Sequence, residues 1–122
     1  MNNQFLLVFL GGGVGSLLRY GLARSLETLP SDFPLPTFLA NIAACVLLGV
    51  VAGLAARSAV TEPQRLFLIT GVCGGFSTFS TFSGESLTLL QSGRVALAAL
   101  YILCSVAACL LGVAAGNFIA SR

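Results

Sequence analysis

The stretch FPLPTFLANIAACVLLGVVAGLAA, residues 33–56, decides the fold of this chain, because none of its 24 side chains carries a charge. A helix that crosses the hydrocarbon core of a bilayer, about 30 Å thick, needs roughly 20 mainly apolar residues. A continuous apolar run of this length is typical of a membrane-spanning helix. The stretch therefore predicts a transmembrane helix over residues 34–56.

Three further stretches lack formal charge, namely residues 1–18, 66–84 and 95–121. With the first stretch they predict four spans, at residues 4–25, 34–56, 65–90 and 95–120, within a single transmembrane domain that covers residues 1–122. Strands of a β-barrel are disfavoured, because the apolar runs are long and continuous and do not alternate over ten-residue segments. The expected fold class is an all-α membrane protein with four helices per subunit.

The composition supports the same conclusion. Hydrophobic residues make up 57% of the chain and charged residues only 8%, whereas charged residues make up about 25% of an ordinary soluble domain. The net charge of +2 and the lack of a basic tract exclude a nucleic-acid partner. The expected surroundings are membrane lipid, and the expected location is the plasma membrane, the inner membrane of a bacterium, crossed several times.

The arginines give almost no signal of orientation. With both termini on one side of the membrane, each side receives three arginines. The two groups are Arg57, Arg65 and Arg122, and Arg19, Arg24 and Arg94. An excess of Lys and Arg normally orients a membrane protein, so a balanced chain can insert either way up. We expect dual topology and an antiparallel pair of copies; the alternative is a single orientation fixed by weaker biases.

The third span contains the least ordinary sequence, GVCGGFSTFSTFSGES at residues 71–86. Each interior glycine destabilises a helix by about 1 kcal/mol relative to alanine, and hydroxyl side chains compete for backbone carbonyls. This pattern predicts a helix break near Gly74–Gly75. Carbonyls freed at membrane depth must be satisfied by protein, water or an ion, so the break is a candidate cation site made of backbone oxygens.

Phe79 and Phe82 stand three residues apart and therefore lie on one helix face. Lipid or a packed core is the ordinary environment of such rings, but the hydroxyls between them make the segment too polar for a purely lipid-facing role. The electropositive edge of an aromatic ring, together with O–H and N–H donors, can replace the water around a small anion. The segment is therefore a candidate anion site.

Two more side chains bear on that site. Asn41 lies in an apolar run and must face other helices or a cavity; an interhelical hydrogen bond and a pair of N–H donors for an anion explain it equally well. Arg19, near the end of the first span, either draws anions into a vestibule or extends to the lipid headgroups. Glu85 would repel anions if it acted alone, so we expect it to pair or to cap a helix.

An enzyme is not expected. The chain has no histidine, and its four acidic residues are scattered, so neither a carboxylate pair nor a catalytic triad can be drawn. The cysteines lack the spacing of metal ligands and are interpreted as small buried apolar residues. They are Cys45, Cys73, Cys104 and Cys109.

Three motifs resemble the Fluc/CrcB family of fluoride channels over nearly the whole chain. They are GGGVGSLLRY at residues 11–20, PTFLAN at residues 36–41 and GVCGGFSTFSTFSGE at residues 71–85. The resemblance implies an antiparallel, dual-topology homodimer of four-helix subunits with a broken third helix. It also implies a passive, fluoride-selective channel that exports cytoplasmic fluoride and protects against its toxicity.

The resemblance implies functional residues as well. The pore rings correspond to Phe79 and Phe82, the pore amide to Asn41, and a structural Na⁺ at the dimer centre to the backbone carbonyls of Gly74 and Ser77. The polar track corresponds to Thr37, Ser80, Thr81, Tyr101 and Ser105, with Arg19 in the vestibule. Departures from the family pattern include Ala44–Cys45, where Gly-Ser is frequent, and Cys109, where Ser is frequent.

Two other functions compete with a channel. A small multidrug-resistance transporter is also a short four-helix protein, but its cation exchange requires a carboxylate in the first helix, and residues 1–26 contain no acidic residue. A scaffold subunit that transports nothing is the second alternative. A scaffold would tolerate substitution of Asn41 or Phe82 without loss of any ion flux.

Overall fold

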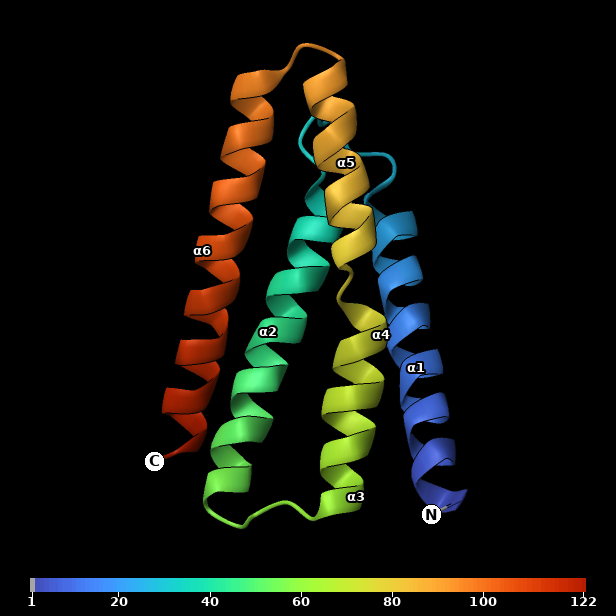
Figure 1. The fold of residues 1–122 in the computed structure, drawn as a ribbon, viewed down its shortest axis with the longest axis vertical. Helices are drawn as coiled ribbons and strands as arrows, with labels where there is room; N and C mark the ends of the chain where they lie inside the picture. Colours follow the sequence, from blue (N-terminus) through green and yellow to red (C-terminus); the bar gives the residue numbers. More distant parts are fainter. Residues whose placement is uncertain (1) are drawn as a thin grey trace.

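The computed structural model describes residues 2–122, with side chains from residue 3 onward, and contains helices and loops but no strand over that range. The elements are α1 (Asn2–Leu26), α2 (Leu35–Ala56), α3 (Glu62–Arg65), the π-helical η1 (Leu66–Cys73), α4 (Gly74–Phe76), α5 (Phe79–Gln91) and α6 (Val95–Ala120) (Figure 1). Four helical segments are long and apolar enough to cross a membrane, at Asn3–Leu26, Leu35–Ala56, Glu62–Gln91 and Val95–Ala120. The expected all-α fold with four membrane-spanning helices is therefore confirmed.

Both chain ends lie at the same end of the bundle as the connection between α2 and α3 (Figure 1). The connections from α1 to α2 and from α5 to α6 lie at the opposite end. At that end Arg94 forms an ion pair of 2.7 Å with Asp32, which joins the two connections. The helices therefore run alternately up and down, the arrangement on which the count of three arginines per side depends.

Glycines allow two pairs of helices to pack closely. The first helix, α1, packs along η1 and α4, while α2 packs along α6. A Cβ atom at Gly71 would lie 2.8 Å from the Cα of Gly11, and one at Gly116 would lie 2.9 Å from the backbone nitrogen of Val50. These distances leave no room for a side chain, so backbone meets backbone in both pairs.

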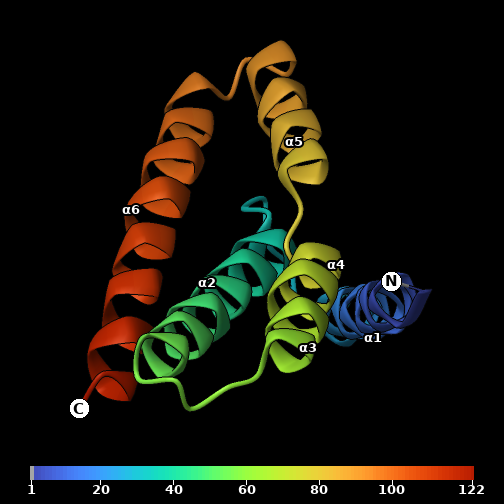
Figure 2. The same cartoon turned by 60° about the horizontal axis from the view of Figure 1, so that its bottom comes forward.

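The third span changes direction between α4 and α5. Ser77 has φ −75° and ψ 154°, and Thr78 has φ −151° and ψ 117°, so both have extended backbone. Before these residues the chain packs on α1, and after them α5 packs on α6. Figure 2 shows the short link that carries the chain from one neighbour to the other.

The position of this link differs from the break expected near Gly74–Gly75, since both glycines are helical. Packing explains the difference. A Cβ atom at Gly75 would lie 3.1 Å from the Cα of Gly12, so Gly75 is needed for the approach of α1. The hydroxyl residues Ser77 and Thr78 supply the side-chain bonds that allow the helix to stop.

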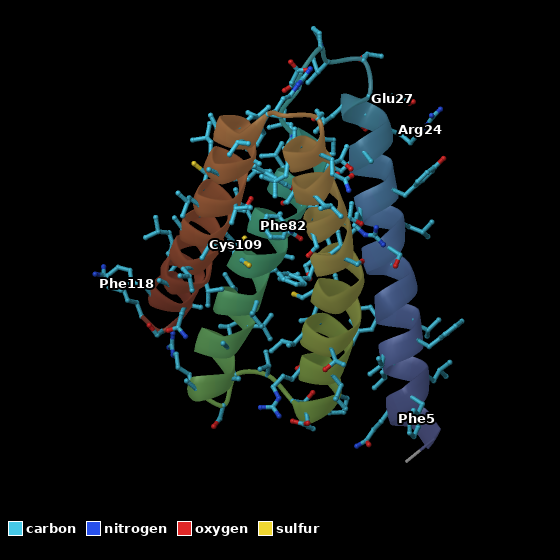
Figure 3. The ribbon with its side chains drawn as sticks, turned by 45° about the horizontal axis from the view of Figure 1, so that its top comes forward. Phe5, Arg24, Glu27, Phe82, Cys109 and Phe118 are labelled. Carbon is cyan, nitrogen blue, oxygen red and sulfur yellow. The ribbon has the colours of Figure 1, made fainter. Side chains whose placement is uncertain are left out.

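The outer surface is apolar, as a lipid environment requires. Figure 3 shows Phe5 of α1 and Phe118 of α6 directed away from the bundle. The fully buried large side chains of the described residues are only Tyr101 and Val51. Most of the large apolar surface therefore faces outward, and small residues fill the narrow spaces between the helices.

Gly15→Ala should destabilise the protein, because the new Cβ would lie 2.7 Å from the backbone nitrogen of Phe76 and 3.0 Å from the carbonyl carbon of Gly75. We expect a loss of about 2 kcal/mol, within the range of about 1–3 kcal/mol for overpacked sites. Circular dichroism during unfolding in detergent measures it. Gly13→Ala is the matched control, since nothing lies within 4 Å of its Cβ position. Equal stability of the two variants would contradict the packing of α1 described above.

Candidate functional site: two grooves beside the helix break

Asn41 of α2 holds the backbone at the point where the third span stops being helical. Its Oδ1 accepts a hydrogen bond of 2.8 Å from the backbone N–H of Thr78, and its Nδ2 donates one of 3.3 Å to the carbonyl oxygen of the same residue. The interhelical hydrogen bond considered for Asn41 is therefore present. One N–H of its amide group remains for another acceptor, because the group carries two.

Other side chains satisfy the rest of the link. The Nε of Arg19 donates a hydrogen bond of 3.2 Å to the carbonyl oxygen of Gly75. The hydroxyl of Ser77 donates one of 2.7 Å to the carbonyl oxygen of Cys73. The Oγ1 of Thr78 accepts one of 3.2 Å from the backbone N–H of Thr81 and so caps the first turn of α5. Protein groups thus replace several of the helical bonds that the link gives up.

A first groove, with a volume of about 340 Å³, lies between α2, α5 and α6. We call it the phenylalanine groove. It is lined by Asn41, Cys45, Ser77, Thr78, Phe79, Phe82, Ser105, Val106, Cys109 and Leu110. Its surface is mainly apolar, with a few polar groups, the usual composition of a small-ligand site.

Phe79 and Phe82 share this groove, as their spacing predicts. Their ring centroids lie 5.8 Å apart, and the ring of Phe82 lies 5.1 Å from that of Tyr101 on α6. Phe79 is 79% exposed, whereas Phe82 is partly buried. The ring of Phe82 is therefore held by its neighbours, whereas the ring of Phe79 is exposed at the surface of the subunit.

Ser105 adds a polar group to the phenylalanine groove. The residue is 5% exposed, and its Oγ has no hydrogen-bond partner among residues 3–122. A hydroxyl buried without a partner is destabilising by about 1–3 kcal/mol. This hydroxyl is therefore available to a ligand in the groove that it lines.

A second groove of about 350 Å³ lies on the other side of the link, and we call it the arginine groove. It is lined by Ser16, Arg19, Tyr20, Ala23, Pro36, Thr37, Thr78, Thr81 and Glu85. Thr78 lines both grooves. Thr78 thus lies between a groove that contains a charged arginine and a groove that contains aromatic rings.

Glu85 is an acceptor for two hydroxyl groups. Its Oε1 accepts a hydrogen bond of 2.8 Å from Thr37, and its Oε2 accepts one of 2.7 Å from Tyr101. No ion pair among residues 3–122 includes Glu85. Glu85 therefore pairs with hydroxyl donors from α2 and α6 and not with a charged group, and it lines the arginine groove.

The structure distributes the expected site residues unevenly. The phenylalanine groove contains Asn41, Ser77, Phe79, Phe82 and Ser105, and the arginine groove contains Arg19, Thr37 and Thr81. Three expected residues line neither groove, namely Tyr101, Ser80 and Gly74. Tyr101 is fully buried, at 0% exposure, whereas Ser80 and Gly74 are exposed. The hydroxyl of Ser80 lies 3.3 Å from that of Thr78.

Several groove residues lie outside the expected site, among them Thr78, Cys45 and Cys109. Thr78 lines both grooves, and the preference of Thr for the cap of a helix is the available signal, since Thr78 precedes the first turn of α5. For Cys109 the signal is the family resemblance, which places it where Ser is frequent. No spacing in the sequence marks Cys45.

Residues 6–117 match the family described as "CrcB-like protein, Camphor Resistance (CrcB)". This chain belongs to the CrcB family. The resemblance based on three motifs is thereby confirmed.

Curated relatives of this CrcB chain are similar over most of their length. One from Phocaeicola vulgatus is 49% identical over 93% of this chain and 94% of the relative. One from Methylobacterium sp. is 46% identical over 89% of each chain, and one from Flavobacterium psychrophilum is 44% identical over 94% of each. All three relatives carry the name "Fluoride-specific ion channel FluC".

Tyr101→Phe should destabilise this CrcB protein, because Oε2 of the half-buried Glu85 loses its donor. A fully buried acceptor left without a partner lowers the unfolding free energy by about 1–3 kcal/mol, so we expect a loss of about 1 kcal/mol at this half-buried position. Tyr20→Phe is the matched control, since Tyr20 is 65% exposed on α1. Unfolding in detergent, followed by circular dichroism, compares the two variants. Equal effects would show that the bond between Tyr101 and Glu85 contributes nothing.

Proposed function

We propose that this protein is a fluoride-selective channel that lets cytoplasmic fluoride leave the cell passively and so protects against fluoride toxicity. One observation carries the proposal: the phenylalanine groove gathers two aromatic rings, the amide of Asn41 and the unpartnered hydroxyl of Ser105. Ring edges and N–H and O–H groups are donors that suit a small anion. The name of the relatives identifies that anion as fluoride.

The proposed path begins in the arginine groove, where the positive charge of Arg19 raises the local concentration of anions. It passes the hydroxyls of Thr78 and Thr81, with Ser80 beside them, and enters the phenylalanine groove. There the free N–H of Asn41 replaces water around the ion. The rings of Phe79 and Phe82, together with Ser105, complete the coordination.

Thr37 and Tyr101 have a different part in this path. Each donates a hydrogen bond to one carboxylate oxygen of Glu85. We infer that they are positioning residues: their hydrogen bonds partly offset the negative charge of Glu85, which lines the arginine groove, and reduce its repulsion of an anion. The ring of Tyr101 also packs on that of Phe82 and fixes its orientation.

Acid chemistry explains why such a channel protects a cell. Hydrogen fluoride crosses the plasma membrane uncharged and dissociates in a more neutral cytoplasm, where the anion accumulates. An anion-selective pore in that membrane lets the membrane potential expel fluoride. The mechanism is electrodiffusion, with no coupling to ATP or to protons, and no enzymatic step is needed.

We propose that the channel is an antiparallel homodimer with a broken third helix in each subunit. The balanced arginines support this arrangement, because copies that insert in both directions can pair about an axis in the membrane plane. The exposure of Phe79 supports it as well, since a partner would cover that ring. Each path would then use residues from both subunits.

A structural Na⁺ at the dimer centre fits the backbone at the link. In a continued helix the N–H of Thr78 would bond to the carbonyl of Gly74, but it donates to Asn41. The N–H of Thr81 would bond to the carbonyl of Ser77, but it donates to Thr78 Oγ1. Both carbonyl oxygens are thus released from helical bonds, and unwound carbonyls are known ligands of Na⁺. A bound Na⁺ would attract the released carbonyl oxygens of both subunits and so hold their two links together.

Fluoride efflux from liposomes that contain only this protein tests the proposed function. After a potassium ionophore is added, a fluoride electrode should record rapid release, whereas matched liposomes loaded with chloride should release little. Absence of fluoride release from folded, dimeric protein would overturn the proposal.

Asn41→Asp and Phe82→Ile should each reduce efflux to the rate of protein-free liposomes. The aspartate still accepts the N–H of Thr78 but replaces the donors with a negative charge, and isoleucine removes a ring edge. Phe118→Ile is the matched control, because Phe118 lies on the outer face of α6 (Figure 3). Size-exclusion chromatography establishes that the variants remain dimeric. Normal efflux through both site variants would remove the site assignment.

The dimer should also be stabilised by Na⁺ specifically, because a ligand that binds only the folded state raises its stability with concentration. The midpoint of thermal unfolding in detergent is expected to rise with sodium chloride and to stay unchanged with choline chloride at the same ionic strength. Identical curves in the two salts would contradict the sodium site and leave the fluoride path unaffected.

A further inference from the structure

Cys45 of α2 and Cys109 of α6 lie on two helices that pack closely together. A Cβ atom at Gly112 would lie 3.5 Å from the Cβ of Cys45, so Cys45 points at the turn of α6 that contains Gly112. Cys109 precedes Gly112 by three residues and lies on the same helix face. Both cysteines therefore lie along the contact between α2 and α6.

Both thiols line the phenylalanine groove. The other two cysteines do not: Cys73 is buried, and Cys104 lines neither groove. Figure 3 shows Cys109 and Phe82 in the space between α2, α5 and α6. The pair is therefore reachable from the groove, in mainly apolar surroundings.

Ser105 provides an independent observation at the same place. It precedes Cys109 by four residues, one helical turn, and lines the same groove. Its buried Oγ has no partner among residues 3–122. Two thiols and a hydroxyl without a hydrogen-bond partner thus line one groove.

We propose that Cys45 and Cys109 form a two-thiolate site for a soft, thiophilic metal cation, and that an occupied site closes the phenylalanine groove to anions. Thiolates select soft cations. As each sulfur bonds to the metal, its thiol releases one proton to water in the groove, and no atom is oxidised or reduced. With Hg²⁺ the product is neutral, which suits apolar surroundings, where an unpaired charge is strongly disfavoured.

The number of ligands determines which metals bind. No group of three or more His, Cys, Asp or Glu side chains occurs within the part of the chain that the structure describes. Zn²⁺ in proteins takes four ligands in a tetrahedral arrangement, so two thiols do not hold it firmly. Hg²⁺ and Ag⁺ form stable linear complexes with two sulfur ligands and fit the pair.

Mass spectrometry of the intact protein tests the site without any measurement of transport. The variant Cys73→Ala/Cys104→Ala keeps only the pair. Treated with Hg²⁺ and then with excess 2-mercaptoethanol, it should retain one Hg²⁺ per chain, because a monothiol removes metal from a single cysteine faster than from two. Adding Cys45→Ala or Cys109→Ser should abolish retention. Zn²⁺ should not be retained by any of these proteins.

Equal retention by the pair variant and by Cys45→Ala, or no retention by either, would overturn the two-thiolate site. Circular dichroism of each variant excludes unfolding as the cause of a loss. Retention by the original chain alone would also overturn the site, because the metal would then depend on Cys73 or Cys104.

Flux measurements test the second half of the proposal, which rests on the proposed function. Hg²⁺ should stop fluoride efflux from liposomes that contain the pair variant, and dithiothreitol should restore it. For the variant with Cys45→Ala, the efflux rate measured before Hg²⁺ is added is the reference, and Hg²⁺ should leave that rate unchanged. Metal retention without a block would overturn closure of the groove. Absence of efflux before Hg²⁺ is added would overturn the proposed function, while the mass measurement would still decide the metal site.

Discussion

A polypeptide backbone at membrane depth must be hydrogen-bonded, because lipid offers neither donors nor acceptors. The rest of this structure depends on how that requirement is met at Ser77 and Thr78, where the third span leaves its helix. Asn41 bonds to both backbone groups of Thr78, and Arg19 bonds to the carbonyl of Gly75. Without these two side chains from neighbouring helices the extended link would expose unpaired polar groups to hydrocarbon.

The link has a structural consequence, since it moves the chain from α1 to α6. The part before it packs closely on α1 through glycines, which places Arg19 beside the carbonyl of Gly75. The part after it carries Phe82 to the ring of Tyr101 and brings Glu85 to two hydroxyl donors. The break in hydrogen bonding thus creates both grooves, and Thr78 separates them.

The contents of the phenylalanine groove follow from which side chains the packing leaves without partners. The hydroxyls of Thr37 and Tyr101 are used by Glu85, whereas that of Ser105 is free. One N–H of Asn41 is used by the backbone and one is not. Donors that remain unpaired in apolar surroundings attract an anion strongly. The two thiols in the same groove are instead ligands for a metal cation, as we propose above.

The sequence by itself determined the four spans, because long uncharged runs have no alternative but the bilayer, and it determined the pairing of Phe79 with Phe82, because helical spacing is local. It also indicated a break in the third span, but it placed that break near Gly74–Gly75. Only the tertiary structure decided that these glycines serve the contact with α1 and that the chain leaves the helix at Ser77 and Thr78. The hydrogen bonds of Glu85 and the position of Cys45 and Cys109 in one groove were likewise undetermined, because they bring together residues distant in the chain. They depend on how closely separate helices approach, and no local pattern encodes that distance.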